Sequence, residues 1–366
     1  MATQNRFFAC ETRVVSGLGC ISQLPSELTH YKLTNPALVV DAGIAKAGLL
    51  EKWLTPEILN LPARILAPPN PDLDSVRKGI EVAKKAKCDG VVIVGGGSSI
   101  CLGKAVAICL VNPGDILEYE GNEKMLSLPV PTICVPTTAG SGSEVSRVLV
   151  LHEHGRPTEV IVRGFGTEPR VALLDGNVLL SCPKKPMLDA ALDAITHACE
   201  SLWSRRRTLI TDALAEKALE TMITRLPAAL NDRDPEACQE IMEASSAANL
   251  ACGNTGLALI HALTMSPDVP LPHGYQNGCL LLAVAKFNRS LMDPRHQKLV
   301  DQLEPLFKKI GWGGLYNANE IDDHNAFLMV RASTGNPFRI NNIRASSDQE
   351  CYEILRSSGA SISAAA

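Results

Sequence analysis

Four side chains between residues 189 and 273 have the types and the spacing of a metal centre. Asp193 and His197 lie four residues apart in the segment LDAITHACES, which has a helical pattern. That spacing places both side chains on one helix face, one turn apart. His261 lies in the apolar helical pattern LALIHALTM, and His273 lies in PLPHGYQNG. One carboxylate and three imidazoles are a ligand set that suits a divalent transition metal, either iron(II) or zinc.

The two later histidines require a specific arrangement of helices. Twelve residues separate His261 from His273, and twelve helical steps leave two side chains about 120° apart. Pro267, Pro270 and Pro272 also interrupt any helix between them. We therefore expect His261 near the end of one helix, a proline-rich turn, and His273 at the start of the next helix.

The Asp193/His197 pair also has a simpler interpretation. An Asp-x-x-x-His pair is often a surface pair, or contains a buried histidine with structural hydrogen bonds. The metal interpretation is favoured because a carboxylate and three imidazoles all lie in apolar helical patterns. Burying such groups without partners is costly.

Composition excludes several classes of function. The chain has 366 residues, which is enough for two domains, and a net charge of −4, which implies no general attraction to nucleic acid or membranes. Its twelve cysteines include no C-x-x-C pair, which is typical of reduced thiols. The N-terminus lacks a signal-peptide pattern, and no apolar run has the length of a membrane span. We therefore predict a cytoplasmic protein.

Strands and helices alternate in the first half of the chain. Buried-strand patterns are ALVVD (37–41), the start of ARILAPPNPD (63–72), GVVIV (90–94), PTICVP (131–136) and VALLD (171–175). Helical patterns between them predict a mostly parallel sheet covered on both faces. Short antiparallel pieces are expected at RVLVLHE and TEVIVR.

From about Pro183 onward only helices are predicted, at 186–204, 208–224, 235–252, 254–265, 273–289, 295–310 and 325–332. The sequence therefore predicts an α/β domain over residues 1–180 and an all-helical domain over residues 181–366.

A glycine-rich turn follows one of the predicted buried strands. GVVIVGGGSS places three glycines and two serines between a strand and a helix. Glycine permits positive φ and close backbone approach, and a helix N-terminus offers free N–H groups to a phosphate. The turn matches neither G-x-G-x-x-G nor a P-loop, and glycine turns often only pack. A second loop, PTTAGSGSEVS (136–146), is rich in hydroxyls, although it could be an ordinary Ser/Gly loop.

Taken together, these segments resemble the iron-containing (group III) alcohol dehydrogenases. LDAITHACESLWS, GLALIHALTM and PHGYQNG resemble the family's metal-binding segments, and GGGSS (95–99) and PTTAGSGSEVS follow its order and approximate spacing. The resemblance covers about residues 10 to 315. It implies a Rossmann-like α/β domain followed by an all-α domain, which is the dehydroquinate synthase-like architecture of that family. The first domain would bind a dinucleotide, and the second would bind metal and substrate.

The resemblance also implies roles for individual residues. Asp193, His197, His261 and His273 would hold the metal, with no catalytic residue beyond the metal centre. Cofactor contacts would come from Gly96, Gly97, Ser98, Thr137, Thr138 and Ser141. Asp41 matches an acidic position used against the adenosine ribose, which favours NAD(H) over NADP(H) because a carboxylate repels a 2′-phosphate. Asp41 could equally be a helix cap.

Three positions depart from the family pattern. Cys101 stands where the family commonly has an aspartate, and Met265 stands where it often has a histidine four residues after the third ligand. The loop after the Asp193/His197 helix, usually neutral, contains Arg205, Arg206 and Arg207. These arginines could form a solvated loop. Alternatively, with Met265, they could contact an anionic substrate, since guanidinium groups bind phosphonate, sulfonate or carboxylate in a bidentate manner.

The expected function is a metal-dependent, NAD(H)-linked alcohol dehydrogenase or aldehyde reductase. Its expected substrate is a small aldehyde, with anionic phosphono- or sulfo-aldehydes as the finer prediction. Alternatives with the same fold are a maleylacetate reductase-like enzyme, a polyol dehydrogenase, and a dehydroquinate synthase-like lyase that uses NAD transiently. The lyase would need a phosphate site rich in lysine and arginine, which is not clearly present. A homodimer is expected because dimers are the commonest soluble assemblies.

Overall fold

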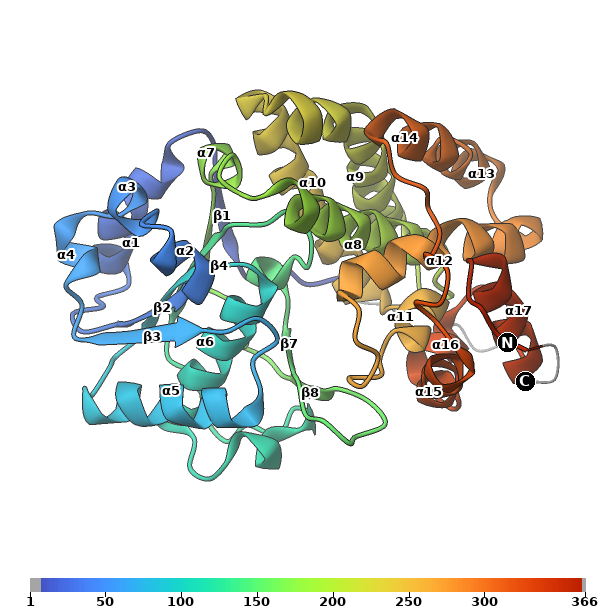
Figure 1. Cartoon of the computed structure of the whole chain (residues 1–366). Helices are drawn as coiled ribbons and strands as arrows, with labels where there is room; N and C mark the ends of the chain where they lie inside the picture. The colour runs from blue at the N-terminus through green and yellow to red at the C-terminus, as the bar shows by residue number, and fades with distance from the viewer. Residues whose placement is uncertain (1–7, 364–366) are drawn as a thin grey trace. The chain divides into compact units, whose positions relative to one another are not determined.

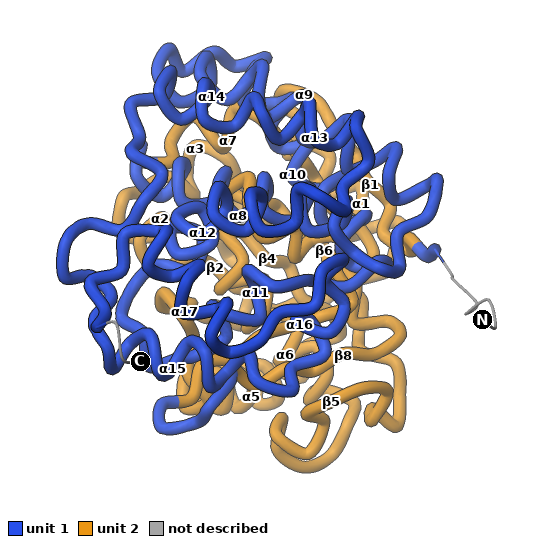
Figure 2. Tube along the Cα trace, turned by 90° about the vertical axis from the view of Figure 1, so that its right-hand side faces the viewer, with its two compact units in different colours: residues 1–9, 154–158, 183–366 blue, residues 10–153, 159–182 orange. Residues whose placement is uncertain are grey.

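The computed structural model describes residues 8–363, which divide into two compact units (Figure 2). The α/β unit comprises Cys10–Glu153 and Glu159–Cys182. The described part of the helical unit comprises residues 8–9, the short segment His154–Thr158 and residues 183–363.

The α/β unit is built on a six-stranded sheet with the order β1-β9-β6-β4-β2-β3, and all its neighbouring strands are parallel. Its strands are β1 (Arg13–Ser16), β2 (Ala37–Asp41), β3 (Ala63–Ala67), β4 (Val91–Gly95), β6 (Thr132–Pro136) and β9 (Val171–Leu174). The central strands β2, β4 and β6 are continuous apolar runs, as expected of strands covered on both faces. The predicted parallel sheet is confirmed.

Helices cover both faces of this sheet. Alternate residues of β2 point to opposite sides: Val39 packs in a core with α5 (Leu73–Lys85) and α6 (Gly97–Val111), whereas Leu38 and Val40 pack in a second core. The second core contains residues from α1 (Leu24–His30), α3 (Leu50–Trp53), α4 (Pro56–Leu59) and α7 (Gly176–Leu179), and α2 (Ala42–Lys46) lies beside it. Figure 1 shows α5 and α6 on one face and α1, α3 and α4 on the other.

A small second sheet completes the α/β unit. It contains β5 (Gly121–Asn122), β7 (Val148–Leu151) and β8 (Val160–Arg163), in the order β5-β8-β7. The β7–β8 pair is antiparallel, as the sequence predicts.

The helical unit is arranged around α8 (Lys184–Leu202), which packs against α9 (Leu209–Pro227), α10 (Pro235–Thr255) and α12 (His273–Asn288). The remaining helices are α11 (Leu259–Leu263), α13 (Pro294–Val300), α14 (Leu303–Ile310), α15 (Asp323–Ser333), α16 (Pro337–Asn341) and α17 (Asp348–Ser357). No helix within residues 8–363 has both the length and the apolar character that crossing a membrane requires.

Two of the predicted helices need correction, and two further helices were not predicted. The helix expected at 254–265 is reduced to α11 because Gly256 adopts a φ of 79° and ends α10. The helix expected at 295–310 is divided into α13 and α14, since Pro305 lacks the N–H that would continue the hydrogen-bond ladder to Asp301. Helices α16 and α17 are absent from the sequence prediction.

Candidate metal centre and cofactor site

Three helices bring the four predicted metal ligands together. Helix α8 supplies Asp193 and His197, α11 supplies His261, and His273 is the first residue of α12. Asp193 Oδ1 lies 3.8 Å from His197 Nε2, 3.4 Å from His261 Nε2 and 3.8 Å from His273 Nε2. The ligand atoms of Asp193, His197 and His261 all lie within 4.8 Å of one another. One carboxylate oxygen therefore faces three imidazole nitrogens.

This donor set fits a divalent transition metal. Asp193, His197 and His261 are buried, whereas the side chain of His273 keeps 47% of its surface exposed. The rings of His197 and His261 are stacked, with centroids 4.8 Å apart. Three nitrogens and one oxygen, buried on one side and accessible on the other, provide a site that can hold an ion and leave a coordination position for a substrate.

The electrostatics of the cluster favour positive charge at its centre. Burial opposes the ionisation of Asp193, but the surrounding imidazoles outweigh burial and hold its pKa well below the usual range. Burial likewise lowers the pKa of His261, but the carboxylates of Glu200 and Asp193 outweigh that effect and raise the pKa to about 9. A divalent cation among these groups would satisfy the same carboxylates.

Two buried residues that the sequence prediction missed contact this cluster. Glu200, one turn beyond His197 on α8, lies 2.7 Å from His261 Nδ1 through Oε2. Asn277, one turn after His273 on α12, donates from Nδ2 to Asp193 Oδ1 at 2.8 Å. Asn277 Oδ1 accepts from Thr264 Oγ1 at 2.7 Å, which fixes the amide orientation. Their spacing in the sequence could have predicted both contacts, because Glu200 follows His197 by three residues and Asn277 follows His273 by four, about one helical turn in each case.

The residues predicted to contact the cofactor lie at or just beyond the carboxyl ends of the parallel strands. Strands β2, β4 and β6 are neighbours and end at Asp41, Gly95 and Pro136, respectively. The strand order reverses between β2 and β4, because β3 lies on one side of β2 and β4 on the other. Open α/β sheets bind their ligands outside the carboxyl ends of the strands at such a switch point.

The glycine turn and the hydroxyl-rich loop are in close contact. A Cβ at Gly96 would lie 3.0 Å from Thr138 Oγ1, and one at Gly97 would lie 2.6 Å from Ser141 Oγ. Gly96 is the N-cap of α6 with a φ of −79°. The glycines are therefore required by lack of space, and the positive φ that the sequence suggested does not occur at residues 95–97.

The other predicted cofactor residues have defined contacts in the same region. Ser98 Oγ accepts from Asn70 N at 3.2 Å, and Thr137 N donates to Gly95 O at 3.1 Å. Asp41 caps α2, since its Oδ1 accepts from the backbone N–H groups of the second and third helical residues at 2.8 and 3.0 Å. The helix-cap interpretation of Asp41 is thus confirmed, whereas its contact with a ribose stays a prediction.

Two of the positions that depart from the family pattern are buried. Cys101 lies in α6, and its Sγ accepts from Val150 N at 3.4 Å. The cysteine therefore takes part in packing between α6 and β7. Met265 follows α11 and is 5% exposed.

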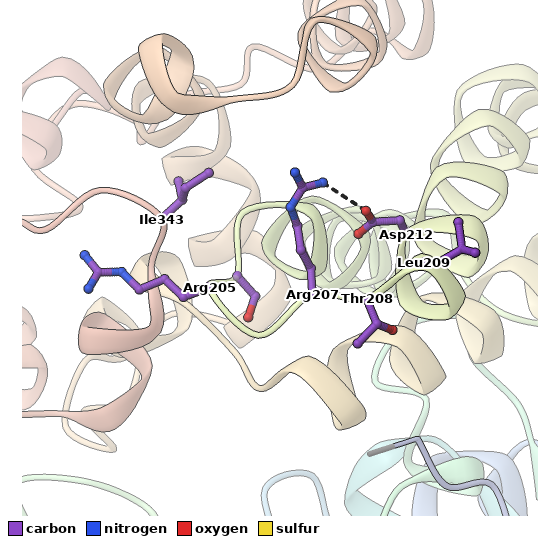
Figure 3. A pocket seen from close by; sticks show the side chains of 7 residues that line it. Arg205, Arg207, Thr208, Leu209, Asp212 and Ile343 are labelled. Atoms are coloured by element: carbon purple, nitrogen blue, oxygen red, sulfur yellow. Dashed lines mark hydrogen bonds and ion pairs between the residues drawn. The ribbon is translucent and has the colours of Figure 1, made fainter. Parts of the chain in front are cut away.

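The arginine loop lines a pocket of about 410 Å³ (Figure 3). Arg205 Nε donates to Asn342 O at 2.8 Å, and Arg207 pairs with Asp212 at 2.9 Å. In Figure 3 the Arg205 side chain extends away from the Arg207–Asp212 pair. Arg206 is exposed. None of the four predicted metal ligands lines this pocket. Its lining residues come from the α8–α9 loop, the start of α9 and the segment after α16, and they are Ser204, Arg205, Arg207, Thr208, Leu209, Asp212 and Ile343.

Comparison with known proteins identifies the family. The family model described as iron-containing alcohol dehydrogenase matches residues 11–176, and that of the Fe-containing alcohol dehydrogenase family, C-terminal, matches residues 187–354. This chain belongs to the iron-containing alcohol dehydrogenase family. Among its relatives, Alcohol dehydrogenase 4 of Schizosaccharomyces pombe is 32% identical over 76% of this chain and 67% of its own length. The NAD-dependent methanol dehydrogenase of Bacillus methanolicus is 30% identical over 75% of this chain and 74% of its own.

Solved structures agree with this assignment. A 1,3-propanediol oxidoreductase has a TM-score of 0.88 at 25% identity and covers 97% of this chain and 100% of its own. A sulfoacetaldehyde reductase from Bifidobacterium kashiwanohense, solved with NAD⁺, has a TM-score of 0.87 at 24% identity, with 98% and 100% covered. The predicted family, fold class and enzyme class are confirmed: the protein is an oxidoreductase of the alcohol dehydrogenase type. The family's description also agrees with the predicted iron.

Proposed function

We propose that this enzyme is a metal-dependent, NAD(H)-linked alcohol dehydrogenase that works as an aldehyde reductase. One iron(II) ion, with zinc as the alternative, would be held by Asp193, His197, His261 and His273. The observation that carries the proposal is the position of Asp193 Oδ1, which lies within 3.8 Å of three imidazole nitrogens from three helices. Residues 1–180 would bind the dinucleotide, and residues 181–366 would bind metal and substrate.

The residues around the centre would orient the reacting carbonyl group. A bound divalent ion would supply Lewis acidity toward the carbonyl oxygen, which stabilises the charge that develops as hydride reaches the carbon. Asp193, His197 and His261 exclude water from the buried side of the centre, and the exposed side at His273 leaves room for the substrate. The product alkoxide needs one proton. Met265 has no acidic hydrogen, so that proton comes from a ribose hydroxyl of the cofactor, from water or from another group.

NAD(H) is the cofactor best supported by the carboxyl edge of the sheet. The N-terminus of α6 and the closely packed hydroxyl-rich loop offer N–H and O–H groups for a pyrophosphate. Predicted contacts are Gly96, Gly97, Ser98, Thr137, Thr138 and Ser141. The Asp41 carboxylate at the end of β2 would repel the 2′-phosphate of NADP(H). The Bacillus methanolicus relative is described as NAD-dependent, which supports the same choice.

The proposed substrate is a small aldehyde. The arginine triplet supports an anionic phosphono- or sulfo-aldehyde, as does the likeness in fold to a sulfoacetaldehyde reductase. A neutral aldehyde is the second candidate, because Asp212 pairs with Arg207 and the arginine pocket includes none of the four predicted metal ligands.

A panel of aldehydes tests this proposal. NADH and NADPH oxidation are measured in parallel with neutral and anionic aldehydes, before and after removal of metal by a chelator. We expect activity with NADH that is lost on chelation and restored by iron(II) or zinc. Full activity without metal would contradict the proposal and favour a maleylacetate reductase-like enzyme. Unchanged kinetics toward anionic aldehydes in the Arg205→Ala/Arg206→Ala/Arg207→Ala variant would exclude the role of the triplet.

A homodimer in the cytoplasm is proposed for the assembled enzyme. Dimers are the commonest soluble assemblies, and all twelve cysteines, each within the described residues, are free thiols. Light scattering of the purified protein tests the assembly, since a mass other than twice 39.2 kDa would exclude the dimer.

A further inference from the structure

The carboxylate of Glu200 is fully buried and accepts hydrogen bonds on both oxygens. Its Oε2 accepts from Ala258 N at 2.7 Å and contacts His261 Nδ1 at 2.7 Å. Its Oε1 accepts from Ile260 N at 2.6 Å and from His261 N at 3.2 Å. Four N–H groups from one short segment therefore converge on a single side chain of α8.

Three of these donors are the backbone groups at the start of α11. The first N–H groups of a helix have no partner within the helix, and a side chain at the N-cap usually satisfies them. Ala258 occupies the N-cap of α11 and supplies no such side chain. Glu200 provides the missing acceptor from a different helix. Because α8 also carries Asp193 and His197, the same carboxylate fixes α11 against the helix that holds two other ligands.

The fourth donor, His261 Nδ1, determines which ring nitrogen of His261 carries the proton and which can bind a metal. A histidine that binds a metal must be neutral, and an ionised carboxylate only accepts hydrogen bonds, so the one proton of the metal-bound ring must lie on Nδ1. The other nitrogen, Nε2, then carries no proton and can act as a ligand atom. It lies 3.4 Å from Asp193 Oδ1 and 3.2 Å from Asn277 Nδ2, at the centre of the cluster. Carboxylates that hold the second nitrogen of a metal-bound histidine in this way set both its tautomer and its ring orientation.

We propose that Glu200 is a positioning residue of the metal centre, which fixes both the orientation of α11 and the tautomer of His261 so that Nε2 faces the ion. This inference rests on the proposed function, since it assumes that the four ligands bind a metal. Glu200 does not touch the reacting atoms, and its effect is transmitted through His261.

Glu200→Gln is the sharpest test because it preserves the size of the side chain. Glutamine offers one accepting oxygen and one donating NH₂ group in place of two accepting oxygens. Its NH₂ group must therefore face N–H groups that Glu200 accepts from, either those of the backbone or His261 Nδ1. The ring could then accept from the amide only by moving its proton to Nε2, the nitrogen needed for the metal. We expect the Kd for zinc, measured by competition with a fluorescent chelator, to rise about 10- to 100-fold. The visible spectrum of the cobalt(II) enzyme should also change.

Ser201→Ala provides a matched control. Ser201 is the next residue on α8, is also fully buried, and accepts a hydrogen bond from Thr255 Oγ1 at 3.3 Å. Its replacement should lower the midpoint of urea unfolding while leaving the zinc Kd and the cobalt(II) spectrum unchanged. A purely structural role for Glu200 would make both variants behave alike.

The outcomes separate this inference from the proposed function. A Glu200→Gln protein with the zinc Kd and cobalt(II) spectrum of the wild type would overturn the role of Glu200 alone. Wild-type protein that binds no stoichiometric zinc would refute the proposed function, and the inference with it. If Glu200→Gln does not fold, NMR of the zinc-loaded wild-type enzyme tests the inference instead. Two-bond ¹H–¹⁵N spectra should show a slowly exchanging proton on Nδ1 of His261. A proton on Nε2, or no protected ring proton, would overturn the inference.

Discussion

Replacing Gly274 with alanine should displace His273 from the metal centre. Gly274 is the second residue of α12 and directly follows His273. A Cβ at this position would lie 2.0 Å from the backbone oxygen of Asp189 in α8. Side-chain Cβ atoms essentially never approach other atoms more closely than 3.0 Å, and a backbone oxygen cannot rotate away. The start of α12 must therefore move by at least about 1 Å. Overpacking of this kind lowers the free energy of unfolding by about 1–3 kcal/mol.

A displacement of about 1 Å is large on the scale of metal coordination, where ligand distances are held to about 0.2 Å. The Gly274→Ala enzyme should therefore bind less metal, and misplacement of the reacting groups should reduce kcat/KM by about 100-fold. The assay combines metal content per chain, NADH-linked aldehyde reduction and thermal unfolding.

Gly253→Ala is the control for the Gly274 variant. Gly253 lies within α10, and a Cβ there would meet only Asn249 Oδ1 at 3.8 Å, an ordinary contact. That variant should keep wild-type activity and metal content, and it should gain up to about 1 kcal/mol of stability because alanine is the better helix former. Wild-type metal content and kcat/KM in Gly274→Ala would refute the proposed place of His273 among the ligands.

Three further predictions concern the cofactor and the metal. Asp41→Asn should preserve the α2 cap but raise the NADPH/NADH ratio of kcat/KM, whereas Asp41→Ala should also lose about 1 kcal/mol in urea unfolding; an unchanged ratio in both would exclude the ribose contact. Gly97→Ala should raise the KM for NADH several-fold with little effect on kcat, because its Cβ would lie 2.6 Å from Ser141 Oγ; steady-state kinetics with an unaltered KM would argue against a cofactor at this turn. A divalent metal at 100 times its Kd should stabilise the wild type by about 2.7 kcal/mol in calorimetry, and Asp193→Ala should abolish this gain; equal stabilisation of both would place the ion elsewhere.

The order of strands and helices follows from local sequence patterns, whereas several helix boundaries depend on single residues. The apolar runs of β2, β4 and β6 could be read directly because strands covered on both faces are apolar throughout. The length of α11 could not, since it depends on the φ of Gly256 and on capping by Glu200 from another helix. The break before α14 was missed although Pro305 is visible in the sequence.

The candidate metal site was only partly accessible to local reasoning. The four-residue spacing of Asp193 and His197 implies adjacency on any helix, and both side chains do lie on one face of α8. The expected placement of His261 and His273 on successive helices is also seen. The sequence does not predict a role for Glu200, because a glutamate in a helix usually faces solvent and the burial of Glu200 depends on where α11 packs. The contact of Asn277 with Asp193 likewise depends on the packing of α12 against α8.

Anomalous diffraction from crystals of the iron-loaded enzyme tests the central claim most directly. If these four residues bind the metal, one peak is expected at the iron edge, about 2.0–2.3 Å from Asp193 Oδ1 and from the Nε2 atoms of His197, His261 and His273. A peak at another position, or one that fewer than three of these atoms approach to within bonding distance, would contradict that claim.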